Sequence, residues 1–196
     1  MFEPTKMTKT AILAECAILA AASFVLSLIP GPSMPMGGTI SWFSTVPVLL
    51  AAIRHGSAWG VGTAFVYGFT QMLLGMSNVT YALAVSPAAA VGCALLDYLL
   101  AYAVIGFAGL LYKTAKSKIA GVILAVPVTG ALRLLCSFLS GVLIYGAYAW
   151  DGWPVWLYSL AYNAAWCVPD AALALIGVLA LGNIKALALL PSKSNG

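Results

Sequence analysis

Aromatic and polar side chains are interleaved along residues 137–170, and this combination could bind a small molecule. The aromatic residues of the stretch are Tyr145, Tyr148, Trp150, Trp153, Trp156, Tyr158, Tyr162 and Trp166. The polar residues among them, which a lipid-facing helix does not need, are Ser137, Asp151, Asn163 and Asp170. Aromatic faces beside a few polar groups favour a small-molecule pocket at a membrane surface. An aromatic belt at the level of the lipid headgroups is the alternative interpretation.

Two charged residues inside apolar segments indicate what such a pocket would bind. Asp97 and Arg133 both lie where charge is expensive and is usually paired or functional. Asp97 favours a cationic partner, which is either Arg133 in an internal ion pair or a bound cation. Aromatic faces also attract cations, by about 0.5–2 kcal/mol each. One carboxylate, several rings and the amide of Asn163 suit a flat, positively charged heterocycle with hydrogen-bonding nitrogens.

The sequence lacks the motifs of several other function classes. It contains no P-loop, no G-x-S-x-G and no H-E-x-x-H, and its only histidine is His55. The four cysteines lie in apolar segments without metal-type spacing: Cys16, Cys93, Cys136 and Cys167. No catalytic residues, metal or other cofactor are therefore expected, and no basic run indicates nucleic-acid binding. A substrate-binding or transport subunit fits better than the alternatives, an intramembrane enzyme or a small autonomous permease.

The composition predicts what must position these residues. Of the 196 residues, 63% are hydrophobic and only 7% are charged, whereas soluble domains carry roughly 25% charged residues. A membrane-crossing helix needs roughly 17–25 mostly apolar residues. We therefore expect an all-α integral membrane protein, a single membrane domain over residues 1–196 with six transmembrane helices. The expected helices cover residues 10–29, 40–53 (short, so tilted or only partly spanning), 57–75, 88–112, 119–146 and 156–182. Residues 76–87 are expected to form a polar-leaning loop, either without helix or with a partial helical turn.

The basic residues predict the orientation. Eight of the nine basic residues lie before the first expected helix, between the second and third, between the fourth and fifth, or after the sixth. They are Lys6, Lys9, Arg54, Lys113, Lys116, Lys118, Lys185 and Lys193. The connections 30–39, 76–87 and 147–155 contain neither Lys nor Arg. By the positive-inside rule both termini lie inside, and the aromatic stretch lies near the outer face.

With these features in place, the sequence resembles the thiamine-specific S component (ThiT/YuaJ) family of energy-coupling factor (ECF) vitamin transporters. The resemblance covers about residues 8–182. It is carried by LAECAILAAASFVLSLIP, VPVLLAAIRHG, GTAFVYGFTQMLLG, LLDYLLAYAVIGFAGL and, most specifically, CSFLSGVLIYGAYAWDGWPVWLYSLAYN. It implies a six-helix S-component bundle in the cell membrane that captures thiamine from outside.

The resemblance also implies the ligand-binding residues. The acidic-Tyr pair of the family falls on Asp97 and Tyr98, and the Tyr and Asn of Y-S-L-x-x-N fall on Tyr158 and Asn163. The remaining expected contacts are Ser137 (where the family has His), Tyr145 (where it has Trp), Tyr67 and, near a first-loop Trp of the family, Trp42. Because Ser137 and Tyr145 replace two ring-stacking groups, a related pyrimidine or another vitamin is the alternative ligand.

Import would need partners, since the chain has no ATP-binding motif. The resemblance implies a membrane scaffold subunit carrying two ABC-type ATPases. Small residues let another helix approach closely, and Ala17 and Ala21 fall on the family's small-residue docking motif.

Overall fold

The computed structural model describes residues 7–35 and 37–182, which form a bundle of helices joined by loops. Lys6, Lys185 and Lys193, which contribute to the predicted orientation, lie outside the described residues. The α-helices are α1 (Lys9–Ser27), α2 (Val46–His55), α3 (Ser57–Leu74), α4 (Met76–Val85), α5 (Pro87–Cys93), α6 (Leu100–Ala103), α7 (Ala108–Thr114), α8 (Lys118–Leu143) and α9 (Val155–Gly182).

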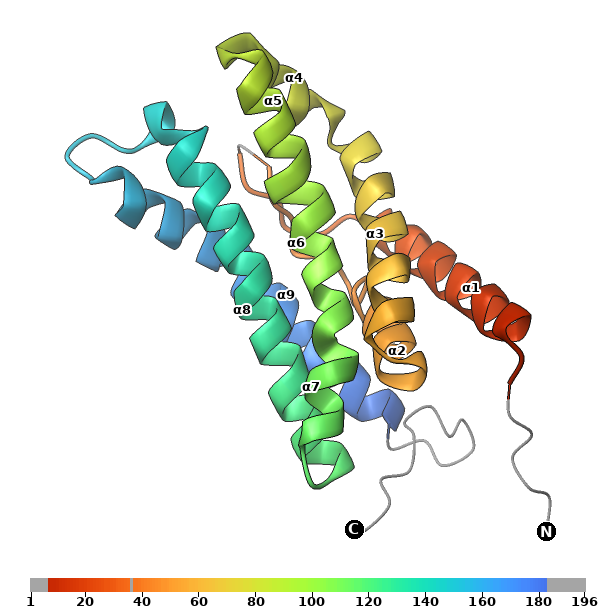
Figure 1. Ribbon diagram of the computed structural model, residues 1–196. Coiled ribbons are helices and arrows are strands. Elements are labelled where there is room, and N and C mark those ends of the chain that lie inside the picture. The colour runs from red at the N-terminus through yellow and green to blue at the C-terminus, as the bar shows by residue number, and fades with distance from the viewer. Residues whose placement is uncertain (1–6, 36, 183–196) are drawn as a thin grey trace, which may run out of the picture.

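Residues 87–114 form one continuous helical rod of mixed geometry (Figure 1). A π-helical turn, Ala94–Leu99, joins α5 to α6, and a 3₁₀ turn, Val104–Phe107, joins α6 to α7. π-Helical turns inside α-helices are frequent at functional sites. This one carries Asp97 and Tyr98.

Four helical segments of the described chain are long and apolar enough to cross a membrane: Lys9–Ser27, Pro87–Thr114, Lys118–Leu143 and Val155–Gly182. Large apolar side chains on their outward faces, such as Ile18, Val91 and Ile176, are more than half exposed. Such surfaces are stable in lipid rather than in water. The chain is a multi-pass membrane protein.

Three predicted boundaries differ from the structure. The helix expected over 40–53 begins only at Val46, because Ser41 is held by Asp170 and Phe43 has a left-handed backbone (φ 59°). Residues 76–87, expected as a loop with at most a partial helical turn, instead contain the ten-residue helix α4, whose residue Asn78 turns its polar side chain inward to Tyr98. The helix expected over 119–146 ends at Leu143, so Tyr145 lies in the connection to α9.

The apolar core and the polar interior occupy different ends of the bundle. The core centres on α2 and its neighbours, with Val48, Leu49, Ile53, Tyr112 and Val122 fully or almost fully buried. Small residues permit close contact there, since a Cβ on Gly60 would come within 2.4 Å of Ala52 and one on Gly109 within 2.2 Å of the Ala52 carbonyl oxygen. Figure 1 shows the α2–α3 and α7–α8 turns at this end, and the α4–α5 turn and the α8–α9 connection at the opposite end.

Candidate functional site

A cavity of about 330 Å³ lies between the helices, with walls from α3, the 87–114 rod, α8, α9 and the loop that joins α1 to α2. Seven of the eight residues predicted to contact a ligand line it: Tyr67, Asp97, Tyr98, Ser137, Tyr145, Tyr158 and Asn163. They come from segments far apart in the chain, so the fold brings them together at one place. The volume is in the range of small-molecule sites.

Trp42, the eighth predicted residue, is not among the residues that line the cavity. Its indole Nε1 donates to the carbonyl oxygen of Pro30 at 2.9 Å, and the residue is 40% exposed. Trp150, Trp153 and Trp156 are also largely exposed on the neighbouring connection and the start of α9.

Asp97 projects into the cavity from the π-helical turn. The hydroxyl of Ser140 on α8 donates to its Oδ2 at 2.5 Å. Within residues 7–35 and 37–182, no Lys, Arg or His forms a salt bridge with it. Its carboxylate therefore meets the cavity without a salt bridge to any cation of these described residues.

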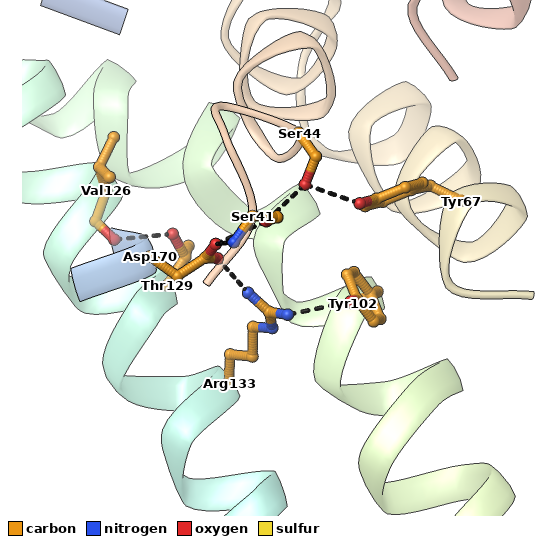
Figure 2. Close-up of polar contacts among 8 residues, drawn as sticks. All are labelled: Ser41, Ser44, Tyr67, Tyr102, Val126, Thr129, Arg133 and Asp170. Atoms are coloured by element: carbon orange, nitrogen blue, oxygen red, sulfur yellow. Dashed lines mark hydrogen bonds and ion pairs between the residues drawn. The ribbon is translucent and has the colours of Figure 1, made fainter. Parts of the chain in front are cut away.

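Arg133, the other charged residue of the cavity wall, pairs with Asp170 instead. Its Nη1 lies 2.6 Å from Asp170 Oδ2, and its Nη2 donates to the Tyr102 hydroxyl at 2.9 Å (Figure 2). The guanidinium carbon is 4.5 Å from the centre of the Tyr102 ring and 4.9 Å from that of Trp166, within range of cation–π attraction. Arg133 therefore pairs with Asp170 and not with Asp97, two alternatives between which the sequence does not distinguish.

Asp170 also anchors the loop that precedes α2. Its Oδ1 accepts the backbone N–H of Ser41 at 2.9 Å and the Ser41 hydroxyl at 2.6 Å. Ser44 donates to Ser41 Oγ, and Tyr67 donates to Ser44 Oγ, as Figure 2 shows. A chain of hydrogen bonds thus runs from Tyr67 on α3 through the loop to a carboxylate on α9.

Asn163 is placed where a ligand nitrogen or oxygen could meet an amide. Its Nδ2 donates to the carbonyl oxygens of Ser137 (3.2 Å) and Ser159 (2.9 Å), and its Oδ1 accepts from Trp166 Nε1 at 3.3 Å. These bonds fix the amide orientation against α8. Ser137, one helical turn from Arg133, presents its buried side chain to the same cavity.

Tyrosine rings form much of the remaining wall. Tyr158 packs edge-to-face on Trp150, with ring centres 5.2 Å apart, and in a tilted arrangement on Tyr162 at 5.7 Å. Tyr145 and Tyr148 are similarly tilted at 6.3 Å. The aromatic stretch thus divides into rings that line the cavity and rings, such as Trp153 and Trp156, that do not.

Several lining residues were not assigned to the site from the sequence: Gln71, Asn78, Tyr102, Tyr148, Tyr162 and Trp166. Spacing could have indicated two of them, because Gln71 lies four residues after Tyr67 and Trp166 lies three after Asn163, on the same helix faces. Asn78 could not be found this way, since its segment was expected to be a loop.

The small residues predicted to contact a partner lie on the outer side of α1. Ala17 and Ala21 are exposed, whereas Cys16 and Ala20 on the opposite face are buried in the bundle. In the described part of the chain, no group of three or more His, Cys, Asp or Glu residues could hold a metal ion.

Sequence comparisons identify relatives along most of the chain. A family model described as "Thiamine transporter protein (Thia_YuaJ)" matches residues 13–189. Thiamine transporter ThiT of Bacillus subtilis is 35% identical over 169 residues, which cover 81% of this chain and 83% of the relative. Thiamine transporter ThiT of Lacticaseibacillus paracasei is 26% identical over 161 residues, covering 78% of this chain and 77% of the relative.

Solved structures share the fold. ThiT from Listeria monocytogenes superposes with a TM-score of 0.75 at 29% identity, covering 93% of this chain and 99% of that chain. An S component of a bacterial ECF transporter superposes with a TM-score of 0.56 at 24% identity, covering 90% of this chain and 98% of that chain. With a family match from residue 13 to residue 189 and a similar structure over nearly the whole chain, this chain belongs to the thiamine transporter protein (Thia_YuaJ) family.

Proposed function

We propose that this chain is the thiamine-binding S component of an ECF transporter and captures thiamine from outside the cell. One observation carries the proposal: Asp97 meets a cavity lined by aromatic rings without a cation of the described chain beside it. Thiamine combines a cationic thiazolium with an aminopyrimidine, so it matches both features. The relatives are named thiamine transporters, which supports transport rather than catalysis.

The cavity suggests how thiamine is held. Asp97 neutralises the thiazolium, and the Tyr145 ring stacks near it. Tyr158 and Asn163 contact the aminopyrimidine, which offers both donors and acceptors. Tyr67, Tyr98 and Ser137 complete the wall, whereas Trp42 is left out of this contact set because its indole is engaged with the Pro30 carbonyl.

Six membrane crossings with both termini inside would place the cavity toward the outside. Arg54, Lys113, Lys116 and Lys118 are in or beside the α2–α3 and α7–α8 turns, which lie at one end of the bundle in Figure 1. Tyr145 and Tyr148 of the α8–α9 connection, at the opposite end, line the cavity, which supports this orientation. At ten residues, α2 is too short to cross alone. The loop before it completes the second crossing, since non-helical backbone is tolerated at membrane depth when protein surrounds it, and Ser44 and Thr45 are buried.

Energy for import would come from partners in the cell membrane, a scaffold subunit carrying two ABC-type ATPases. The exposed Ala17 and Ala21 supply a surface on α1 for that scaffold. Vesicles containing this chain alone should bind thiamine without accumulating it, and accumulation should require the partners and ATP.

Titration of the purified protein with thiamine tests the proposal. We expect saturable heat release in calorimetry and quenching of tryptophan fluorescence, because Trp166 lines the cavity. The matched ligand is the neutral 4-amino-5-hydroxymethyl-2-methylpyrimidine, which lacks the thiazolium. Tighter binding of this pyrimidine than of thiamine would instead favour a pyrimidine-specific S component, a candidate supported by Ser137 and Tyr145 at the two positions where the family carries larger rings.

A further inference from the structure

The charges that line the cavity cancel. Of the described residues that line it, two are charged, the acidic Asp97 and the basic Arg133. A cavity with one charge of each sign has little net attraction for a cation, because Arg133 repels what Asp97 attracts. Cation selection therefore needs a further negative charge close to Arg133.

Asp170 supplies that charge from behind the cavity wall. It does not line the cavity, but its Oδ2 lies 2.6 Å from Arg133 Nη1, and it is 2% exposed. The field of a close ion pair falls off with distance faster than that of a lone guanidinium. At the cavity, Asp170 thus cancels most of the repulsion that Arg133 would exert on a cation.

Arg133 cannot readily move away from the site. It is 7% exposed, lies against the rings of Tyr102 and Trp166, and donates to the Tyr102 hydroxyl. Loss of its carboxylate partner would leave its charge buried beside the cavity, and an uncompensated buried charge is strongly unfavourable. The ligand would then experience that charge directly.

We propose that Asp170 is a specificity-determining residue: by neutralising Arg133, it leaves Asp97 as the net charge of the site and so gives a cation preference over neutral ligands. Asp170 acts through Arg133 and is a positioning residue rather than a ligand contact. The proposal rests on the proposed function, since it takes thiamine as the cation.

A purely structural role for Asp170 makes a different prediction. Its bonds to Ser41 hold the loop before α2, and four residues of that loop line the cavity: Gly37, Gly38, Thr39 and Ser41 itself. If Asp170 only anchored the loop, removing its carboxylate would lower the affinities for charged and neutral ligands by the same factor. The ratio of thiamine affinity to pyrimidine affinity separates the two roles.

The test measures this ratio by calorimetry for the unaltered chain and for Asp170→Asn, Arg133→Gln, the Arg133→Gln/Asp170→Asn double variant and Ser41→Ala. We expect Asp170→Asn to lower the ratio by about tenfold, as expected for a unit charge exposed near the cavity. The double variant, which lacks both charges, should return the ratio to within about threefold of the unaltered chain. Ser41→Ala removes a hydroxyl donor without changing charge, so it should weaken both ligands and leave the ratio unchanged.

Each result counts for or against the proposal. An unchanged ratio in Asp170→Asn, or a ratio that the double variant fails to restore, overturns it. If Asp170→Asn cannot be purified in a folded state, Arg133→Gln provides the test. Removing the positive charge should raise the ratio of thiamine affinity to pyrimidine affinity, and an unchanged ratio would contradict the proposed role of the pair. Absence of thiamine binding by the unaltered chain overturns the proposed function instead. If the unaltered chain binds thiamine but the affinity ratio does not change in Asp170→Asn, only this inference is overturned.

Discussion

Two carboxylates near the cavity differ in what surrounds them. Asp170 accepts from a guanidinium, a hydroxyl and a backbone N–H, so its charge is fully compensated within the protein. Asp97 accepts from the Ser140 hydroxyl and has no salt bridge within the described residues. A partly buried carboxylate without a counter-charge favours a cationic partner, so the two residues are suited to different tasks.

At Asp97, we predict that substitution by Asn lowers the affinity for thiamine by about tenfold or more and changes the affinity for the neutral pyrimidine by less than about threefold. The amide keeps the size of the side chain and removes its charge. Calorimetry with both ligands provides the measurement. Asp151→Asn, the same change on the exposed α8–α9 connection, serves as the control and should leave both affinities unaltered. Equal losses for the two ligands in Asp97→Asn would contradict an electrostatic role.

Sequence reasoning identified the charged residues but not all of their pairings. The apolar surroundings of Asp97 and Arg133 were enough to mark both as significant. Which carboxylate Arg133 meets depends on which faces of three helices point toward one another, and residue spacing within one helix cannot supply that. Asp170 is 37 residues from Arg133, so only the packing of α8 against α9 brings them together.

At the scale of elements, the loop between α1 and α2 forms part of the cavity wall. Its glycines permit a very close approach: Gly38 has φ 85° and lies against the indole of Trp166, where an added Cβ would be 2.5 Å from Nε1. Gly37, with φ 95°, lies equally close to Asn78, and its carbonyl accepts from Tyr162. The loop is thus fitted to side chains from α4 and α9.

For this loop, we predict that Gly38→Ala lowers thiamine affinity by about tenfold, because the new methyl group must push Trp166 or the loop out of place. Gly152→Ala is the matched control, since Gly152 also has a left-handed backbone (φ 79°) but a Cβ there would meet nothing within 4 Å. Both substitutions strain the backbone similarly, so a comparable loss of affinity in the two variants would exclude close packing as the cause. Calorimetric titration of the two purified proteins makes the comparison.

The long helices were predictable and the short ones were not, for a physical reason. Segments such as 87–114 and 155–182 are long and apolar enough to cross a membrane, so hydropathy predicts them to within about two residues of the observed ends. The π-helical turn, the late start of α2 and the existence of α4 depend on particular tertiary contacts, including Ser41 with Asp170 and Asn78 with Tyr98. Local hydropathy carries no information about such contacts.

For the whole molecule, we predict that the α8–α9 connection faces outward and the α7–α8 turn inward. In the Asp151→Cys variant the introduced cysteine should react with a membrane-impermeant maleimide on intact cells, and in the Lys116→Cys variant only after permeabilisation. Both residues are exposed, whereas the native Cys16, Cys93 and Cys167 are buried and Cys136 is partly buried within α8. The unaltered chain, which carries these four cysteines, measures their background labelling. The reverse labelling pattern would invert the proposed orientation.

Three tyrosines of the cavity wall donate their hydroxyls to backbone carbonyl groups of the protein itself. Tyr98 donates to the Gly75 carbonyl, Tyr145 to that of Asn78 and Tyr162 to that of Gly37. Each bond fixes a ring before any ligand arrives, so the loss of rotamer freedom, about 0.5–1.5 kcal/mol for each ordered side chain, is incurred during folding rather than during association. These rings can then contact a ligand chiefly through their faces. A planar ligand would be recognised by its shape and by the π-electron density of the rings, and binding would cost little entropy for ordering the protein.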